Sequence, residues 1–425
     1  MAEIAPFRGI RYNVGAVHLN DVTSPPYDVI SPADREYFHR RHPKNVVRLI
    51  LGQELPEDSA ADNRFTRAAA YLEEWIAEGT LVRDPKPALY VHEQHYRFRG
   101  AARTVRGFAA LVRLHNCADG VILPHENTLA KPKSDLVRLI RATKANLDSV
   151  YAVHPDPEHV VDAVLDRVAA TPTAGEATDR DGVRHRLWRM EDQAQIGAIV
   201  LAMAGRQLVI ADGHHRYEAS LAYRDEMRER EGDPHGDRPY DYIMMTLVNA
   251  YSPGVAALPT HRVVRGLPLH AARDMDSRLA EQFDLVGSSR ESVLIDMEEY
   301  GGRAVGIYRA GRAYIAIPKP GSTSAIPGPP ALQALDVSVL HELILGRILG
   351  VDAERLRLEE NVSYTRDERE AIEAVDRGEA QLAFFLNPIK LEAVLEVAQR
   401  GQRMPQKATY FYPKLLSGLV MRRIE

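Results

Sequence analysis

The chain has 425 residues, of which 45% are hydrophobic and 27% are charged, and its formal net charge at pH 7 is −5. This apolar content can build a sizeable core, so it excludes general disorder. The slightly negative balance excludes binding to nucleic acid or to an anionic membrane by charge alone. The single cysteine, Cys117, excludes an intramolecular disulfide and a zinc site built from cysteines.

Apolar periodicity and turn residues predict strands and helices mixed along the chain. The predicted helices are one that begins at Ser31 and those at 63–78, 134–146, 155–170, 214–231, 337–349, 366–376 and 389–399. The predicted strands are 7–12, 88–96, 103–114, 207–211, 242–248, 304–308, 313–317 and 381–385. The Pro- and Gly-rich passage 318–330 is the predicted linker. Without regular alternation, these elements predict an α+β fold with a mixed sheet and flanking helices.

The strongest motif lies where the strand at 207–211 turns through Asp212 into a helix that begins with His214, His215 and Arg216. The first turn of a helix offers free N–H groups and the positive end of the helix dipole. Two imidazoles and a guanidinium there predict a phosphate-binding site, with Asp212 beside it to hold a metal ion or a substrate hydroxyl. The alternative is that Asp212 only caps the helix and the histidines lie at the surface. A zinc site is disfavoured, because adjacent histidines point in different directions on a helix.

A second motif, 24–32, places Tyr27 and Asp28 among prolines that fix the backbone. A rigid carboxylate suits a general base or a magnesium ligand, although such a residue more often caps a turn. Asn45 and Arg48 lie just before an apolar run, where an ordinary solvated edge is the simpler reading.

The remaining candidates come from three segments and are His125 and Glu126; Thr260, His261 and Arg262; and Lys407. The first pair precedes a basic helix and could act as an acid/base or metal pair, whereas a solvated basic helix is the commoner case. The second segment repeats the His–Arg pattern. The third brings scarce lysines beside an aromatic stretch, which could close a pocket or form a last core strand. The chain has no Walker loop, no dinucleotide-binding glycine motif and no nucleophile elbow.

Six segments together resemble a bacterial and archaeal family, the domain-of-unknown-function family ten-fifteen. They are 6–9, 25–30, 45–49, 212–217, 258–262 and 405–414. One departure is Ala408, where the family pattern Gln-Lys-Ser-Thr has a serine, so one hydroxyl contact is in doubt. The resemblance implies a core like that of the ParB/sulfiredoxin superfamily, with elaborations. That superfamily includes free serine kinases, and a helix-opening motif of this kind holds nucleotide phosphates in it.

By this resemblance His214, His215 and Arg216 bind phosphate, and Asp212 lies at the metal or at the transferred group. We add Lys407 to the phosphate site and take Asp28 as the base, with Glu126 in reserve. The candidate substrate-binding residues are Tyr27, Asn45, Arg48, His125, Thr260, His261 and Arg262.

We therefore predict a small-molecule phosphotransferase, most concretely a kinase of free serine or a similar hydroxy compound. Its donor would be ATP, ADP or pyrophosphate with Mg²⁺. The alternatives are a non-enzymatic nucleotide-binding regulatory module of ParB type and, less favoured, a phosphohydrolase that uses the same site.

We expect a phosphate-binding and catalytic region at 1–265 and a C-terminal α+β region at 266–425, whose last segment, 404–420, returns to the site. The N-terminus has no apolar signal core, and the most apolar stretch, 196–204, is too short to span a bilayer. We therefore expect a cytoplasmic protein that binds a small molecule, with neither membrane nor nucleic acid as a partner. A homodimer is compatible with the sequence.

Overall fold

The computed structural model describes residues 2–98, 100–126, 130–232, 236–301, 303–358, 360–405 and 407–425. Gln406, in the C-terminal motif, lies outside these residues. The chain divides into a first unit of residues 1–124, 128–255 and 413–425 and a second unit of residues 125–127 and 256–412. The linker predicted at 318–330 is wrong as a boundary, because these residues lie inside the second unit and form η4 (Ser322–Ala325) and the start of α11 (Pro330–Gln333).

The described part of the first unit has a nine-stranded sheet in the order β6-β11-β8-β12-β5-β4-β10-β9, with β1 paired to β5. Its strands are β1 (Ile4–Ala5), β4 (Leu89–Phe98), β5 (Ala101–Arg113), β6 (Ile122–Leu123), β8 (Val150–His154), β9 (Gly175–Thr178), β10 (Arg184–Met190), β11 (Leu208–Asp212) and β12 (Tyr242–Asn249). The pairs β11–β6 and β12–β8 are parallel and the others are antiparallel. The predicted mixed sheet is therefore confirmed.

Helices and two pairs of short strands complete the described part of this unit. The helices are α1 (Leu19–Val22), η1 (Tyr27–Val29), α2 (Pro32–Arg41), α3 (Val47–Ile50), α4 (Arg64–Ala77), η2 (Cys117–Asp119), α5 (Ala130–Thr143), α6 (Val160–Ala169), α7 (Gln193–Met203), α8 (His214–Glu231) and η3 (Pro239–Asp241). The strands are β2 (Ile10–Tyr12), which pairs with β3 (Leu81–Arg83), and β7 (Ala145–Asn146), which pairs with β21 (Arg422–Arg423).

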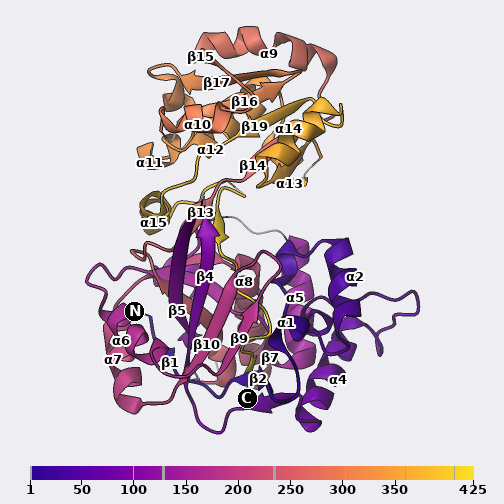
Figure 1. The fold of residues 1–425 in the computed structure, drawn as a ribbon, viewed down its shortest axis with the longest axis vertical. Coiled ribbons are helices and arrows are strands. Elements are labelled where there is room, and N and C mark those ends of the chain that lie inside the picture. Colours follow the sequence, from indigo (N-terminus) through magenta and orange to yellow (C-terminus); the bar gives the residue numbers. More distant parts are fainter. Residues whose placement is uncertain are drawn as a thin grey trace. The chain divides into compact units, whose positions relative to one another are not determined.

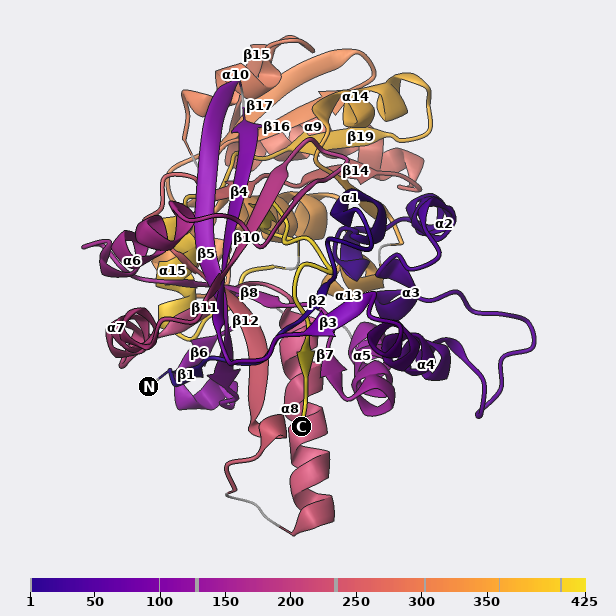
Figure 2. The same cartoon turned by 60° about the horizontal axis from the view of Figure 1, so that its bottom comes forward.

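The two faces of the sheet carry different helices (Figures 1 and 2). On one face α6 and α7 pack on a core that contains Phe108 and Trp188. On the other face α4 contributes Trp75 to a core that contains Tyr90. A third cluster joins α5 and α8 through side chains such as Tyr223. These three clusters hold α8 and the end of β11 against the sheet.

Local sequence explains where several helices begin and end. Ser31 caps α2 by accepting from the backbone N–H of Asp34, and Asn63 caps α4 by accepting from the backbone N–H groups of Phe65 and Thr66. The helix predicted at 134–146 is α5 and ends earlier, at Thr143. Lys144 has φ +48°, which breaks the helix, and the next two residues form β7.

The second unit has a six-stranded antiparallel sheet in the order β15-β17-β16-β19-β14-β18 and a separate pair, β13-β20, among its described residues. The strands are β13 (Ala256–Leu258), β14 (His261–Val264), β15 (Phe283–Ser288), β16 (Val305–Arg309), β17 (Arg312–Pro318), β18 (Val362–Thr365), β19 (Leu382–Phe385) and β20 (Tyr410–Tyr412). Besides η4 and α11, the helices are α9 (Leu269–Gln282), α10 (Val293–Glu298), α12 (Asp336–Ser338), η5 (Val339–Ile348), α13 (Ala353–Leu358), α14 (Glu368–Asp376) and α15 (Leu391–Gln399). The predicted hairpin is confirmed, with positive φ at Ala310 and Gly311 in its turn.

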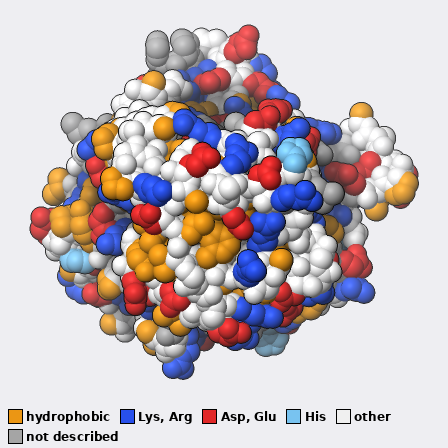
Figure 3. All heavy atoms as spheres, turned by 90° about the horizontal axis from the view of Figure 1, so that it is seen from above, with side chains coloured by type: hydrophobic (Ala, Val, Ile, Leu, Met, Phe, Trp, Pro, Cys, Tyr) orange, Lys and Arg blue, Asp and Glu red, His pale blue; other side chains and the backbone are white. Residues whose placement is uncertain are grey.

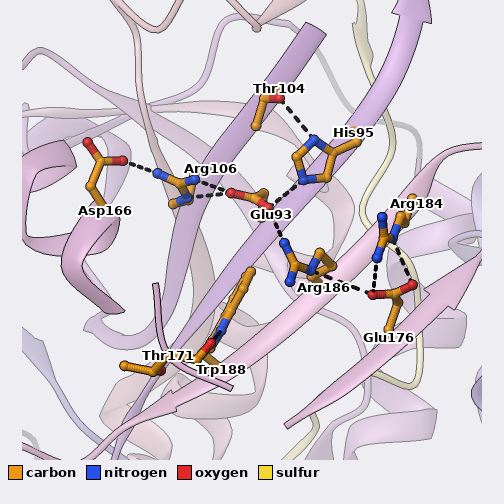
Figure 4. Close-up of polar contacts among 10 residues, drawn as sticks. All are labelled: Glu93, His95, Thr104, Arg106, Asp166, Thr171, Glu176, Arg184, Arg186 and Trp188. Carbon is orange, nitrogen blue, oxygen red and sulfur yellow. Dashed lines mark hydrogen bonds and ion pairs between the residues drawn. The ribbon is translucent and has the colours of Figure 1, made fainter. Parts of the chain in front are cut away.

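A polar network interrupts the sheet face that carries α6 (Figure 4). Glu93 on β4 is 2% exposed, and its carboxylate accepts from Nε of Arg106 at 2.7 Å and contacts Nε2 of His95 at 2.5 Å. Arg186 on β10 lies 3.5 Å from the same carboxylate. Burial alone would raise the pKa of Glu93, but Arg106 and His95 outweigh burial and hold this pKa below its usual value.

We predict that Arg106→Met lowers the free energy of unfolding at pH 7 by about 3 kcal/mol, because it leaves the buried Glu93 charge without its main partner. The folded-state pKa of Glu93 is depressed below the ordinary value of 4.5, so its contribution is present at neutral pH and is lost as the pH falls below 4.5 through the depressed pKa. Urea unfolding at pH 7 and pH 4 should therefore show a smaller difference from wild type at pH 4. Arg184→Met, at an exposed ion pair with Glu176, is the control. Equal differences at both pH values would contradict the prediction.

Two surface properties bear on the expected partners. Among the residues that the structure describes, no helix combines the length and the hydropathy that crossing a membrane requires. On the face shown in Figure 3, basic and acidic side chains are interspersed.

Candidate functional site

The site begins at the turn between β11 and α8, which the sequence predicts. The pairing of β11 with β8 shifts register between Ile210 and Asp212, and such a bulge re-aims the side chains at a strand end. Gly213 has φ +91°, and a Cβ atom there would lie 2.8 Å from Nε of Arg216. Only glycine combines this backbone conformation with the close approach of a guanidinium. The turn is therefore shaped to let Arg216 fold back over it.

Arg216 is 7% exposed and joins three segments of the site. Its Nη1 donates to the carbonyl oxygen of Ser149 at 2.6 Å, and its Nη2 donates to Oδ2 of Asp212 at 2.6 Å. Its buried Nε has no hydrogen-bond partner among the described residues. Burial alone would lower the pKa of Arg216, but Asp212, Asp28 and Asp148 outweigh burial and raise it. The guanidinium therefore stays charged, and its Nε–H is not used by any described residue.

Lys414 supplies the second cation, from a segment 202 residues further along the chain. Its Nζ forms an ion pair with Oδ1 of Asp212, and both side chains are 13% exposed. Burial alone would raise the pKa of Asp212, but Lys414 and Arg216 outweigh burial and lower it to about 2. His214 acts in the same direction. Asp212 is therefore an ionised carboxylate that holds two cations.

The C-terminal segment 413–425 belongs to the first unit and threads through it (Figure 2). The carbonyl oxygen of Lys414 accepts a hydrogen bond from Nε2 of Gln94 at 2.8 Å, and this bond fixes the C-terminal segment to β4. Further on, the backbone N–H of Ser417 donates to the carbonyl oxygen of Ser24 at 2.9 Å. This contact ties the C-terminal segment to the proline-rich loop that carries Asp28.

Two carboxylates that form no ion pair with another described residue lie near Arg216. Asp28 is exposed on η1, and Asp148 precedes β8 and is largely buried. Both raise the pKa of Arg216, so both lie within its electrostatic reach. Burial raises the pKa of Asp148, and Arg216 opposes that shift. The structure thus brings the predicted Asp28 toward the predicted motif and adds Asp148, which the sequence analysis does not select.

The other predicted site residues of the first unit differ in how deeply they are buried and in what they contact. His214 is buried and His215 is half-buried, in the first turn of α8. Tyr27 lies beside Asp28, and burial raises its pKa. Asn45 is fully buried, and its amide bonds the backbone of Asp21, Thr23 and Val47, which is a structural role.

Arg48 donates to the carbonyl oxygen of His39 at 2.9 Å. For Asn45 and Arg48 the described contacts are those of a folded interior, and a substrate contact stays a prediction.

The predicted residues of the second unit form contacts within that unit. Nε2 of His125 lies 2.7 Å from Oγ1 of Thr409. The backbone of Glu126 pairs with that of Met404 in an isolated parallel β-bridge. Arg262 is fully buried and donates to the carbonyl oxygens of Thr260 and Lys407, the latter at 3.0 Å. Burial lowers the pKa of Arg262 to about 10.

His261 lies beside Arg262 on β14, and burial lowers its pKa to about 4. The Lys407 side chain is exposed. For these residues of the second unit, the predicted roles in binding substrate or phosphate stay predictions.

A metal held by the protein does not fit the described side chains. Among the described residues no group of three or more His, Cys, Asp and Glu is arranged to hold a metal ion. Asp212, the predicted ligand, already pairs one oxygen with Lys414 and the other with Arg216. Hard cations such as Mg²⁺ need several free oxygen ligands. The predicted metal role of Asp212 is therefore not supported, and we derive no step through a metal.

Known proteins were compared with the chain. No curated protein matches it. Among solved structures, a conserved hypothetical protein from Pyrococcus furiosus has 13% identity and a TM-score of 0.34, covering 68% of this chain and 87% of that one. A free serine kinase in complex with AMP has 13% identity and a TM-score of 0.34, covering 68% and 83%. SbnI with a C-terminal truncation, from Staphylococcus aureus, has 11% identity and a TM-score of 0.36, covering 73% and 85%.

Likeness at these levels says nothing of substrate or mechanism. The family comparison is more extensive, because its match spans residues 4–338 and includes the Asp28 loop, the Asp212 turn and the Thr260–Arg262 segment. The chain belongs to the family described as "Protein of unknown function (DUF1015)".

Proposed function

We propose that this chain is a small-molecule phosphotransferase that holds the phosphates of a donor at the first turn of α8. The observation that carries the proposal is the buried guanidinium of Arg216, whose Nε has no partner among the described residues. The first turn of an 18-residue helix adds backbone N–H groups and the positive end of its dipole. A phosphate oxygen is an acceptor suited to this combination.

The carboxylates of the site favour transfer over mere binding. A site that only holds an anion gains nothing from nearby negative charge, yet Asp28 and Asp148 lie within reach of Arg216. Transfer to a hydroxyl needs such a group, because the hydroxyl proton must leave as the new P–O bond forms. Asp212 has a different task in this proposal, since it holds Arg216 and Lys414 in place. A core of the ParB/sulfiredoxin type and a serine-like acceptor are parts of the same proposal.

The test is a direct search for a phosphorylated product. The folded chain is incubated with ATP, ADP or pyrophosphate, each with Mg²⁺, and with L-serine and other small hydroxy compounds, and ³¹P NMR monitors the products. We expect a new phosphate ester with at least one donor and acceptor pair. Phosphate released without any ester would indicate a phosphohydrolase. Binding of nucleotide with no turnover would indicate a regulatory module of ParB type, and either result would overturn the proposal.

A further inference from the structure

A cavity of about 190 Å³ lies among η1, α3, α4 and α5 in the first unit, and we call it the outer cavity. Helix α4 packs beside both α3 and α5 there (Figure 2). An engineered apolar cavity of about 150 Å³ holds benzene, so the outer cavity has room for a planar ring system. Five of its lining side chains are aliphatic, namely Leu49, Ile50, Leu51, Leu136 and Leu139.

Aromatic and polar side chains complete the wall of the outer cavity. Tyr27 and Phe65 supply aromatic rings, and such rings stack favourably on the flat face of a nucleic-acid base. Arg64 pairs with Asp135 at 2.7 Å, and 34% of the Asp135 side chain is exposed, which places this pair at the solvent end of the cavity. Arg64 offers N–H donors and Asp135 offers an acceptor, whereas the edge of adenine carries a ring acceptor beside an amino donor. The wall and the polar pair together suit a purine ring.

The outer cavity lies close to the phosphate site at Arg216. Burial raises the pKa of Tyr27, and the charges of Asp28 and Arg216 also act on this pKa, so the Tyr27 hydroxyl lies within electrostatic reach of the phosphate site. One tyrosine side chain thus separates the two, a span comparable to that of the ribose that joins base and phosphates in a nucleotide. An inner cavity of about 30 Å³, with room for water only, also reaches Arg216 and shares four lining residues with the outer cavity, namely Tyr27, Ile50, Leu136 and Leu139.

We infer that the outer cavity holds the purine base of a nucleotide whose phosphates lie at Arg216. This inference rests on the proposed function, for which it names the class of donor, a purine nucleotide rather than pyrophosphate. The ribose lies along Tyr27, and the polar edge of the base faces Arg64 and Asp135. A serine-like acceptor does not suit this cavity, because nearly all of its groups are polar and would lose water against the apolar wall.

The inference is tested on the full chain by isothermal titration calorimetry with ADP, CDP and pyrophosphate. We expect ADP to bind at least about tenfold more tightly than pyrophosphate, because stacking and burial of the base add favourable free energy. CDP, whose single ring fills less of the cavity, should bind at least about threefold more weakly than ADP. Pyrophosphate or CDP that binds as tightly as ADP would overturn the inference. The comparison uses unaltered protein, so it does not depend on how any variant folds.

A variant that fills the outer cavity then locates the base. Leu51 lines the outer cavity but not the inner cavity, so Leu51→Trp should obstruct the base without touching Arg216. We expect ADP to bind about tenfold more weakly to this variant and pyrophosphate to bind within about twofold of wild type. Leu201→Trp, the same exchange at a 77% exposed leucine on α7, is the matched control and should change neither affinity. Unchanged ADP affinity in a folded Leu51→Trp protein would overturn the location.

Adenosine and the assay for a phosphate ester separate this inference from the proposed function. If an ester forms and pyrophosphate binds as tightly as ADP, the inference fails while the proposed function stands. If ADP and adenosine both bind, both bind more weakly to Leu51→Trp, and no donor gives an ester, the proposed function fails and the assignment of the cavity stands.

Discussion

Replacing Arg216 by lysine is expected to weaken the binding of ADP about 100-fold, which is the largest effect on ligand affinity that the site predicts. Lysine keeps the positive charge but lacks the fork of donors with which the guanidinium bonds Ser149 and Asp212 at once. The shorter ammonium group would also lose the Nε–H that the structure leaves for a ligand. Isothermal titration calorimetry of ADP, ATP and pyrophosphate would measure the change.

The control for this experiment is Arg184→Lys. Arg184 forms a comparable two-pronged pair with Glu176, at 2.7 and 2.8 Å, but its side chain on β10 is exposed. We expect ADP affinity to stay unchanged there. Circular dichroism would verify that both variants are folded. An Arg216→Lys protein that is folded and binds ADP within threefold of wild type would show that the guanidinium does not hold phosphate.

Asp212→Asn is expected to lower the free energy of unfolding at pH 7 by about 2.5 kcal/mol, since a pKa difference of about two units is worth that much. The folded-state pKa of Asp212 is about 2, below the ordinary value of 3.8. Its contribution is therefore fully present above about pH 4 and is lost as the pH falls toward 2. Guanidinium unfolding of wild type and variant at pH 7, 5 and 3 would show the difference shrinking only at the lowest pH.

Asp135→Asn serves as the comparison for this pH series. Asp135 pairs with Arg64 at the surface, with 34% of its side chain exposed, so a difference of less than about 0.5 kcal/mol is expected at every pH. If the Asp212→Asn difference were as large at pH 3 as at pH 7, its cause would be lost packing rather than lost charge pairing. The double pairing of Asp212 would then not be the source of its stability.

The local part of the site could be predicted from the sequence, because short-range signals specify it. An apolar run followed by Asp212 and Gly213 predicts a strand, a turn and a helix, and the structure has β11 and α8 at those positions. The prolines around Asp28 likewise predict a rigid backbone in that loop. In both cases the residues that determine the conformation are neighbours in the chain.

The non-local part could not be predicted in the same way. Asp148 reaches Arg216 because β8 pairs antiparallel with β11, and no periodicity within 145–150 reveals that pairing. Lys414 meets Asp212 across 202 residues. The scarcity of lysine indicates the C-terminal stretch, and the sequence analysis selects Lys407 there, whereas the structure places Lys414 at Asp212. The choice between the two lysines depends on which part of that stretch returns to the first unit. Tertiary packing decides the register between strands and which part of the C-terminal stretch packs against the first unit, and a single sequence does not reveal either.

Because Lys414 is synthesised long after Asp212, the ion pair between them forms late in translation. The ribosome adds Lys414 202 residues after Asp212, when β11 and α8 have already left the exit tunnel, so the second cation cannot reach Asp212 before then. Until that moment the nascent chain carries Asp212 with Arg216 alone. Stalled translation products that stop earlier would therefore be unable to pair Asp212 with both Arg216 and Lys414.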